Sequence, residues 1–152
     1  MFYESLSWHG PYELVTVDFS KVPARPGVYV FTESVDPLRP NEPIPSETDL
    51  NYIAAIERLR HTQCVLYVGK ATKLSTRLPG YRFKPYLEIK RRPKGMPTRH
   101  TADPHKGRAL LHAHQFYNGP LYLWWAETSD PEMVEAALIH ELHPVLNTVG
   151  VE

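Results

Sequence analysis

The amino-acid sequence predicts a small α/β (α+β) domain in which helices flank a central three-stranded sheet, mixed or antiparallel. Three observations support this fold class. Short runs of β-forming residues alternate with runs of helical spacing, prolines and glycines separate these runs, and no internal repeat is present. The 152 residues are enough for one ordinary domain with a sizeable core, so we expect a single domain over residues 1–152.

Composition excludes several classes of protein. The one cysteine, Cys64, cannot form an internal disulfide or a thiolate metal cluster, which excludes disulfide-stapled scaffolds and zinc fingers. No apolar run approaches the roughly 20 residues of a membrane helix, and the N-terminus MFYESLSWHG lacks the pattern of a signal peptide. We therefore expect a cytoplasmic protein that does not contact a membrane.

The first half of the chain contains two predicted strands and one predicted helix. YELVTVDF at 12–19 alternates loosely, and GVYVF at 27–31 alternates cleanly after a proline-rich approach, so both are expected to be strands. Four prolines within residues 34–48 predict a loop. Apolar residues at helical spacing within LNYIAAIERLR predict a helix over 50–60.

The second half contains two further strands and three helices. CVLYVG at 64–69 is an apolar strand that ends at a glycine, and LYLWWAE at 121–127 is a strand after a turn. Helices are expected over 73–78, where Pro79-Gly80 stops the helix, and over 109–117. A last helix runs from Pro131 to residue 142, with Asp130 as its cap.

Positive charge is concentrated in one segment, although the chain as a whole has 17 Lys+Arg and 17 Asp+Glu. Residues 77–108 hold ten Lys or Arg against two acidic residues, and residues 109–152 hold six acidic residues and no Lys or Arg. Such a segment suits nucleic-acid phosphates, because each neutralised phosphate releases counterions. A solvated loop that balances its neighbours has the same pattern, so charge alone leaves both interpretations open.

The last predicted helix carries a carboxylate among apolar residues. Glu135, Leu138, Ile139 and Leu142 stand at i, i+3, i+4 and i+7, which places Glu135 on the apolar stripe. Burying an unpaired charge is costly, so this carboxylate is expected to be paired, bound to a cation or at the rim of a cleft. The alternative is that Glu135 lies at the edge of the stripe and extends outward.

A second group of polar residues surrounds the strand predicted over 64–69. Tyr67 and Lys70 lie at its end, and the short helix that follows ends in Arg77. Because Tyr29 also lies in a strand bounded by glycine, the two phenols could lie side by side on one sheet face. With a carboxylate that holds a divalent cation, these groups suit phosphodiester chemistry, although core packing is the alternative role of each tyrosine.

These residues carry a resemblance to a known family. GVY at 27–29 followed by YVGKA at 67–71 resembles the two strand motifs after which the GIY-YIG nuclease family is named. The resemblance continues through KLSTRL, a tyrosine at 81 and EAALIHELHPVLN at 135–147. The run VLYVGKATKLSTRLPGY is most similar to the N-terminal nuclease domain of the protein that makes the incision in bacterial nucleotide-excision repair.

The resemblance implies a GIY-YIG-like fold and a metal-dependent endonuclease. Such an enzyme would hydrolyse phosphodiester bonds by in-line attack of water with one Mg²⁺ or Mn²⁺ ion, and DNA is favoured over RNA as its substrate. Glu135 would be the metal ligand. Arg77 would contact the phosphate and stabilise the transition state, a role that suits its planar guanidinium.

The resemblance also assigns roles around these two residues. Tyr29 or Tyr67 would position or deprotonate the attacking water, with either Lys70 or the metal-bound water supplying what the phenol needs to act as a base. Tyr81 would order water or the leaving group. Asn147 would orient the other groups by hydrogen bonding.

The chain departs from compact relatives by two insertions, at about 34–62 and 82–108. The second insertion is the candidate surface for target choice. Its expected nucleic-acid-binding residues are Arg82, Lys84, Lys90, Arg91, Arg92, Lys94 and Arg99. The alternative function is a catalytically weak or partner-dependent nucleic-acid-binding domain on the same fold, and the sequence leaves open a homodimer or a protein partner.

Overall fold

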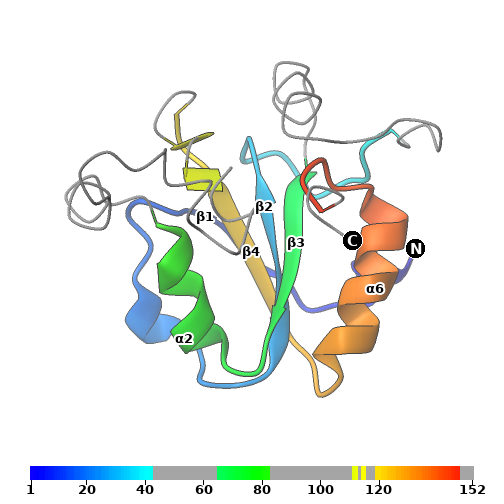
Figure 1. Ribbon diagram of the computed structural model, residues 1–152, viewed down its shortest axis with the longest axis horizontal. Helices are drawn as coiled ribbons and strands as arrows, with labels where there is room; N and C mark the ends of the chain where they lie inside the picture. Colours follow the sequence, from blue (N-terminus) through cyan, green and yellow to red (C-terminus); the bar gives the residue numbers. More distant parts are fainter. Residues whose placement is uncertain (43–64, 83–110, 113, 116–118, 148–152) are drawn as a thin grey trace, which may run out of the picture.

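The structure is a computed structural model that describes residues 1–42, 65–82, 111–112, 114–115 and 119–147. Its centre is a four-stranded sheet in the order β1-β4-β2-β3, with every neighbouring pair antiparallel. The strands are β1 (His9–Glu13), β2 (Gly27–Thr32), β3 (Val65–Ala71) and β4 (Tyr122–Glu127). Two helices, α2 (Leu74–Arg77) and α6 (Pro131–Leu142), flank the sheet (Figure 1). The α/β (α+β) class is confirmed.

The sheet has four strands instead of the expected three, and its first strand is displaced from its expected position. The sequence predicted a strand over 12–19, but β1 ends at Glu13. The backbone turns there, because the Val17 N–H donates to the Glu13 carbonyl at 2.9 Å. Asp18 then accepts from the Ser20 N–H and caps the short 3₁₀ helix η2 (Phe19–Lys21).

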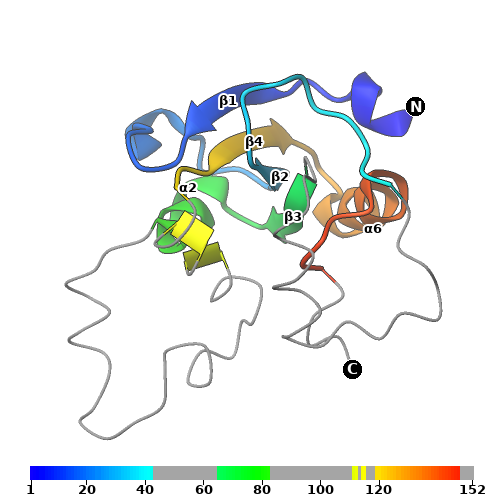
Figure 2. The same cartoon turned by 90° about the horizontal axis from the view of Figure 1, so that it is seen from above.

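Each face of the sheet has its own hydrophobic core. One face packs Tyr29, Phe31 and Trp125 against Leu74, Leu78 and other residues on the α2 side. The opposite face packs Val28, Val30 and Trp124 against Val134, Leu138 and Leu142 of α6. Figures 1 and 2 show α2 and α6 on opposite sides of the sheet. Because both faces are covered, all six residues of β2 are buried.

The helices begin and end where local sequence signals place them. Asp130 caps α6 by accepting from the Met133 N–H at 3.3 Å, and Pro131 occupies its first turn. The helix ends at Leu142, and His143 caps it in a left-handed conformation (φ 53°) just before Pro144. The α2 helix continues into a 3₁₀ helix, η3 (Leu78–Tyr81). The helix predicted over 50–60 lies outside the described residues, and within 109–117 the four described positions are helical.

The outer edge of β3 is covered by backbone and side chains from two other segments. The Leu146 N–H donates to the Leu66 carbonyl at 2.9 Å, and Asn41 bonds to both the N–H and the carbonyl of Val65. An uncovered edge strand would offer free pairing groups to another chain. The segment after α6 therefore completes the sheet on this side.

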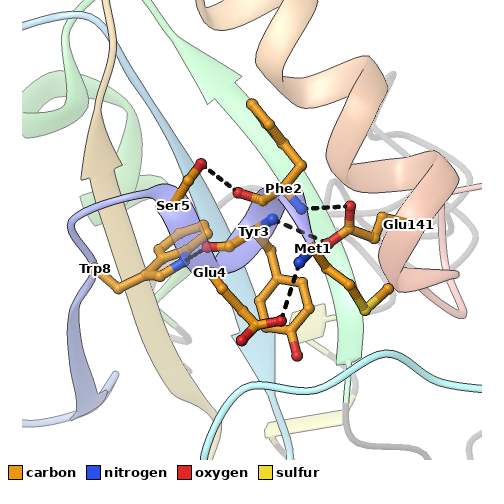
Figure 3. Close-up of polar contacts among 7 residues, drawn as sticks. All are labelled: Met1, Phe2, Tyr3, Glu4, Ser5, Trp8 and Glu141. Atoms are coloured by element: carbon orange, nitrogen blue, oxygen red, sulfur yellow. Dashed lines mark hydrogen bonds and ion pairs between the residues drawn. The ribbon is translucent and has the colours of Figure 1, made fainter.

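The N-terminal end of the chain docks on α6 (Figure 3). The Glu141 carboxylate accepts from the Phe2 and Tyr3 N–H groups at 3.0 and 2.9 Å. These N–H groups open the 3₁₀ helix η1 (Phe2–Ser5), and Trp8 closes the turn by donating its Nε1–H to the Tyr3 carbonyl at 2.7 Å. This end of the chain is thus tied to the face that α6 covers. No helix in the described part of the chain is long and apolar enough to cross a membrane.

Candidate active site

Three tyrosines converge on the α2 side of the sheet. Tyr29 of β2 lies opposite Gly69 of β3, and Phe31 lies opposite Tyr67. Since directly opposite residues and alternate residues along a strand share a face, Tyr29 and Tyr67 project from the same face, as the sequence predicted. Tyr81 reaches them from the end of η3, with its ring centroid 5.3 Å from that of Tyr29 and 6.1 Å from that of Tyr67.

The three phenols form a hydrogen-bonded chain, which we call the phenol cluster (Tyr29, Tyr67 and Tyr81). The hydroxyls of Tyr29 and Tyr81 are 2.6 Å apart, and Tyr81 also bonds to Tyr67. Tyr29 and Tyr81 are 1% and 0% exposed, whereas Tyr67 is partly exposed. Of the three, Tyr67 is therefore the least buried phenol, and the other two lie behind it in the core.

Gly69 makes room for the phenol cluster, a role that the sequence did not reveal. A Cβ at this position would lie 2.3 Å from Cζ and 2.4 Å from the hydroxyl of Tyr29. The sequence placed Gly69 at the end of a strand, but β3 continues through it to Ala71. The sequence showed a glycine at the end of a predicted strand, but it did not show that Tyr29 lies opposite this glycine in the sheet.

Replacing Gly69 with alanine should destabilise the fold by about 1–3 kcal/mol, the usual cost of overpacking a core. The reason is that the new methyl group and the Tyr29 ring cannot occupy the same space. Urea unfolding of the variant would measure the loss. In a Tyr29→Val background the same glycine replacement should cost much less, and an equal cost in both backgrounds would contradict the proposed clash.

Burial raises the pKa of all three phenols well above the usual value for tyrosine. The positive charge of Arg77 opposes this rise at each phenol, and the negative charge of Glu135 adds to it at Tyr29 and Tyr67. The phenols are therefore neutral at physiological pH. A neutral Tyr67 can orient a water, and it would need an added positive charge nearby to act as a base.

The raised pKa values predict a loss of stability in alkali. A group whose pKa is higher in the folded state contributes stability below its unfolded value, near 10 for tyrosine, and loses it as the pH rises above that value. The free energy of unfolding should therefore fall above pH about 10. Urea unfolding from pH 8 to 11 would measure this. Tyr81→Phe removes one titrating group, so a slope as steep as in the wild type would contradict the assignment.

Glu135 lies at the edge of the apolar stripe of α6, and it is also paired. Its side chain is 22% exposed, and Lys70 Nζ lies 4.0 Å from its Oε1. Lys70 is also 4.0 Å from Glu132, whose side chain is 87% exposed. Burial raises the pKa of the Glu135 carboxyl, while Lys70 and, more weakly, Arg77 lower it. Glu135 is thus a partly buried anion that faces a cation at the outer edge of β3.

Arg77 ends α2 with its side chain exposed. Within residues 1–42, 65–82 and 119–147 it forms no ion pair, although its charge acts on the phenol cluster and on Glu135. A guanidinium that is near the other groups and not neutralised by a carboxylate suits a phosphate ligand. Arg77, Lys70, Glu135 and Tyr67 together define the candidate active site.

Asn147 holds β3 from its outer edge. Its Oδ1 accepts from the Val68 N–H at 2.8 Å, and its Nδ2 donates to the Val68 carbonyl at 2.6 Å. Val68 lies between Tyr67 and Gly69, so Asn147 positions the strand that carries the candidate site. These bonds go to the backbone and not to the reacting groups that the sequence led us to expect.

A divalent cation fits the donor set at Glu135. No group of three or more His, Cys, Asp or Glu that could hold a metal ion occurs among the described residues. Mg²⁺, however, commonly binds through one or two carboxylates and completes its shell with waters and substrate phosphate oxygens. Glu135 supplies one such carboxylate at a partly exposed position, and the ion and Lys70 would compete for it.

Of the seven expected nucleic-acid-binding residues, only Arg82 lies in the described part of the chain. Its Nε donates to the Leu14 carbonyl at 2.8 Å, its Nη2 donates to the Val17 carbonyl, and its guanidinium lies 4.4 Å from the centre of the Phe19 ring. Arg82 therefore holds the turn after β1, and its contact with nucleic acid stays a prediction. The other six residues lie in segments that the structure does not describe: Lys84, Lys90, Arg91, Arg92, Lys94 and Arg99.

Four segments thus build the site: β2, β3, the α2–η3 segment that follows β3 closely in the chain, and α6. The order of the strands and the two-sided covering of the sheet bring them together. No family model, no curated protein and no solved structure matches the chain. What the protein does is therefore inferred from these side chains.

Proposed function

We propose that the protein is a metal-dependent endonuclease of the GIY-YIG type that hydrolyses phosphodiester bonds in DNA. One observation carries the proposal. An arginine that forms no ion pair among the described residues, a partly buried glutamate paired with lysine, and a partly exposed phenol lie close enough for their charges to act on one another. This set suits phosphodiester hydrolysis. The reaction needs a carboxylate to hold a metal ion, a positive side chain to bind the phosphate and a polar group to orient the attacking water.

Each side chain has a role that follows from its surroundings. The Arg77 guanidinium binds the non-bridging oxygens of the scissile phosphate and stabilises the charge that grows on them in the transition state. Tyr67 orients the attacking water, because it is the least buried phenol of the cluster. Tyr81 and Tyr29 keep the Tyr67 hydroxyl in place from within the core.

A divalent cation, Mg²⁺ or Mn²⁺, would be held by Glu135 and would supply positive charge to neutralise the phosphate and lower the pKa of water. Lys70 balances the Glu135 carboxylate and can turn toward the phosphate when that carboxylate has another partner. Asn147 and Gly69 act on the site only by holding β3 and admitting the Tyr29 ring.

A cleavage assay tests the proposal. Supercoiled plasmid, labelled single-stranded DNA and labelled RNA should be incubated with the protein in Mg²⁺, in Mn²⁺ and in EDTA. We expect nicking or linearisation of the plasmid with either metal and none in EDTA, because the carboxylate alone cannot neutralise the phosphate. Cleavage that persists in EDTA would contradict the metal requirement.

The assay also separates the proposal from its rival, a nucleic-acid-binding domain without activity of its own. Binding to a short duplex without cleavage under all conditions would favour that rival or a dependence on a partner protein. Gel filtration with and without the duplex would then reveal the complex. Neither cleavage nor binding would contradict both functions.

A further inference from the structure

The described residues line a partly open cavity of about 400 Å³ between β1, β4 and the turn that follows β1. Cavities of this size hold a small ligand or one unit of a larger one. Trp125 of β4 and residues of the segment from β1 to η2 line it, and none of the residues assigned to the proposed reaction does. The cavity is therefore a separate feature with no role in the mechanism described above.

One row of paired residues connects this cavity with the phenol cluster. Gly69 lies opposite Tyr29, Tyr29 lies opposite Trp125, and Trp125 lies opposite His9, so the row crosses all four strands. Opposite residues project from the same face, and neighbouring strands are about 4.8 Å apart. Trp125 therefore stands one strand away from Tyr29, on the face that carries the phenol cluster (Figure 1 shows the strands).

The wall of the cavity is also tied to the phenol cluster through the chain. Arg82 follows Tyr81 directly, and it bonds to the carbonyls of Leu14 and Val17 in the turn after β1. Val17 is one of the residues that line the cavity. Two consecutive residues thus hold the phenol cluster and the cavity wall in a defined position relative to each other.

The floor of the cavity is a pair of stacked rings. The His9 imidazole lies parallel to the Trp125 indole, with 4.0 Å between ring centroids and 11° between ring planes. His9 is exposed, so another planar ring can extend or replace this stack. Trp125 Nε1 is buried and has no hydrogen-bond partner among the described residues, which is uncommon for a buried indole. Stacked aromatic rings of this kind are where proteins hold unpaired nucleobases.

The polar groups of the lining complement the edge of a base. Glu13 and Asp18 supply carboxylate acceptors, and Lys21 supplies donors. The edge of a nucleobase carries both N–H donors and ring-nitrogen or carbonyl acceptors, whereas a phosphate would be repelled by the two carboxylates. The lining therefore favours the base of a nucleotide over its phosphate.

We propose that this cavity binds one unstacked nucleobase of the nucleic acid that is cut at the candidate active site. The inference rests on the proposed function, because that function supplies the ligand. A base held on His9 and Trp125 would anchor the strand next to Arg77 and Tyr67. Enzymes that hold a base in this way choose substrates with single-stranded or weakly paired positions, which are the least costly to unstack.

Nuclear magnetic resonance of the indole N–H groups tests the inference, because the chain contains three tryptophans. Trp8 Nε1 donates to the Tyr3 carbonyl at 2.7 Å and Trp124 Nε1 donates to Thr32 Oγ1 at 3.1 Å, so these two serve as internal controls. The full chain should be titrated without metal with 5′-AMP, GMP, CMP and UMP, and with ribose 5-phosphate as the control that lacks a base. We expect at least one mononucleotide to shift the Trp125 signal saturably, and ribose 5-phosphate not to shift it.

Two variants sharpen the result. His9→Ala should weaken nucleotide binding roughly tenfold, since it removes one stacking surface. His140→Ala removes an exposed imidazole from α6, on the opposite face of the sheet, and should leave binding unchanged. A Trp125 signal that ignores all four nucleotides, or that responds equally to ribose 5-phosphate, would overturn the inference. The wild-type titration alone decides this if His9→Ala does not fold.

The readout is independent of the nuclease. Cleavage that depends on Glu135, combined with an unresponsive Trp125, would overturn the base site and leave the nuclease in place. A responsive Trp125 combined with a protein that cleaves nothing would overturn the nuclease and leave a base-binding cavity. The two failures are therefore distinguishable.

Discussion

Replacing Glu135 with glutamine is expected to lower the rate of metal-dependent cleavage roughly a thousandfold, the effect of losing several kcal/mol of charge stabilisation. Glutamine keeps the size and the hydrogen-bonding oxygen of the side chain but removes the charge that holds a divalent cation. Because the side chain is only partly buried at the edge of the helix stripe, the variant should fold. Single-turnover cleavage of supercoiled plasmid over a range of Mg²⁺ concentrations would measure the loss.

Glu132→Gln is the matched control. Glu132 stands on the same helix and its carboxylate is also 4.0 Å from Lys70 Nζ, but its side chain is 87% exposed. It should change the rate little, because an exposed ion pair contributes little. If both variants lose the same fraction of the cleavage rate, the overall negative charge of α6 supports cleavage and Glu135 has no specific role. Unchanged cleavage by Glu135→Gln would remove Glu135 from the metal site.

Replacing Arg77 with lysine should lower the single-turnover rate about a hundredfold or more, although the positive charge is kept. A lysine binds the phosphate as a point charge and cannot form the two parallel hydrogen bonds that a guanidinium directs at two oxygens. Substrate binding should change much less than the rate, because the geometry matters most in the transition state. Separate measurement of duplex binding and of single-turnover cleavage would show this split.

Arg25→Lys is the matched control, because it makes the same arginine-to-lysine change outside the candidate active site. Arg25 is 75% exposed and lies 3.8 Å from Glu127, in the segment before β2. Its replacement should leave both binding and rate unchanged. A loss in Arg77→Lys that appears equally in binding and in rate would assign Arg77 to substrate binding alone and contradict its role in the transition state.

Local signals predicted most of the described fold. Alternation and β-forming residues placed β2, β3 and β4 to within about two residues, and Asp130 with Pro131 predicted where α6 begins. These signals depend on neighbouring residues in the chain, which is why a sequence carries them. The position of β1 was wrong because the turn at Glu13 is made by backbone bonds that no residue pattern from 12 to 19 announces.

The candidate site was predictable as a set of residues and not as a geometry. The placement of Tyr29 and Tyr67 on one face followed from strand periodicity, and the structure confirms it. Pro79 and Gly80 end the predicted helix before Tyr81, and the 3₁₀ turn η3 carries Tyr81 to within hydrogen-bonding distance of Tyr29. The pairing of Gly69 with the Tyr29 ring depended on a register across two strands that lie far apart in the chain.

The sequence by itself determined the fold class, the apolar stripe of α6 and the residue types available for phosphodiester chemistry, because these depend on composition and short-range periodicity. Only the tertiary structure decided that Lys70 faces Glu135, that Asn147 bonds to the backbone of β3, and that Tyr67 is the least buried member of the phenol cluster. It also decided that Trp125 stands beside Tyr29 and lines a cavity. These outcomes depend on strand order and on burial, which arise when distant segments pack together, and no local pattern encodes them.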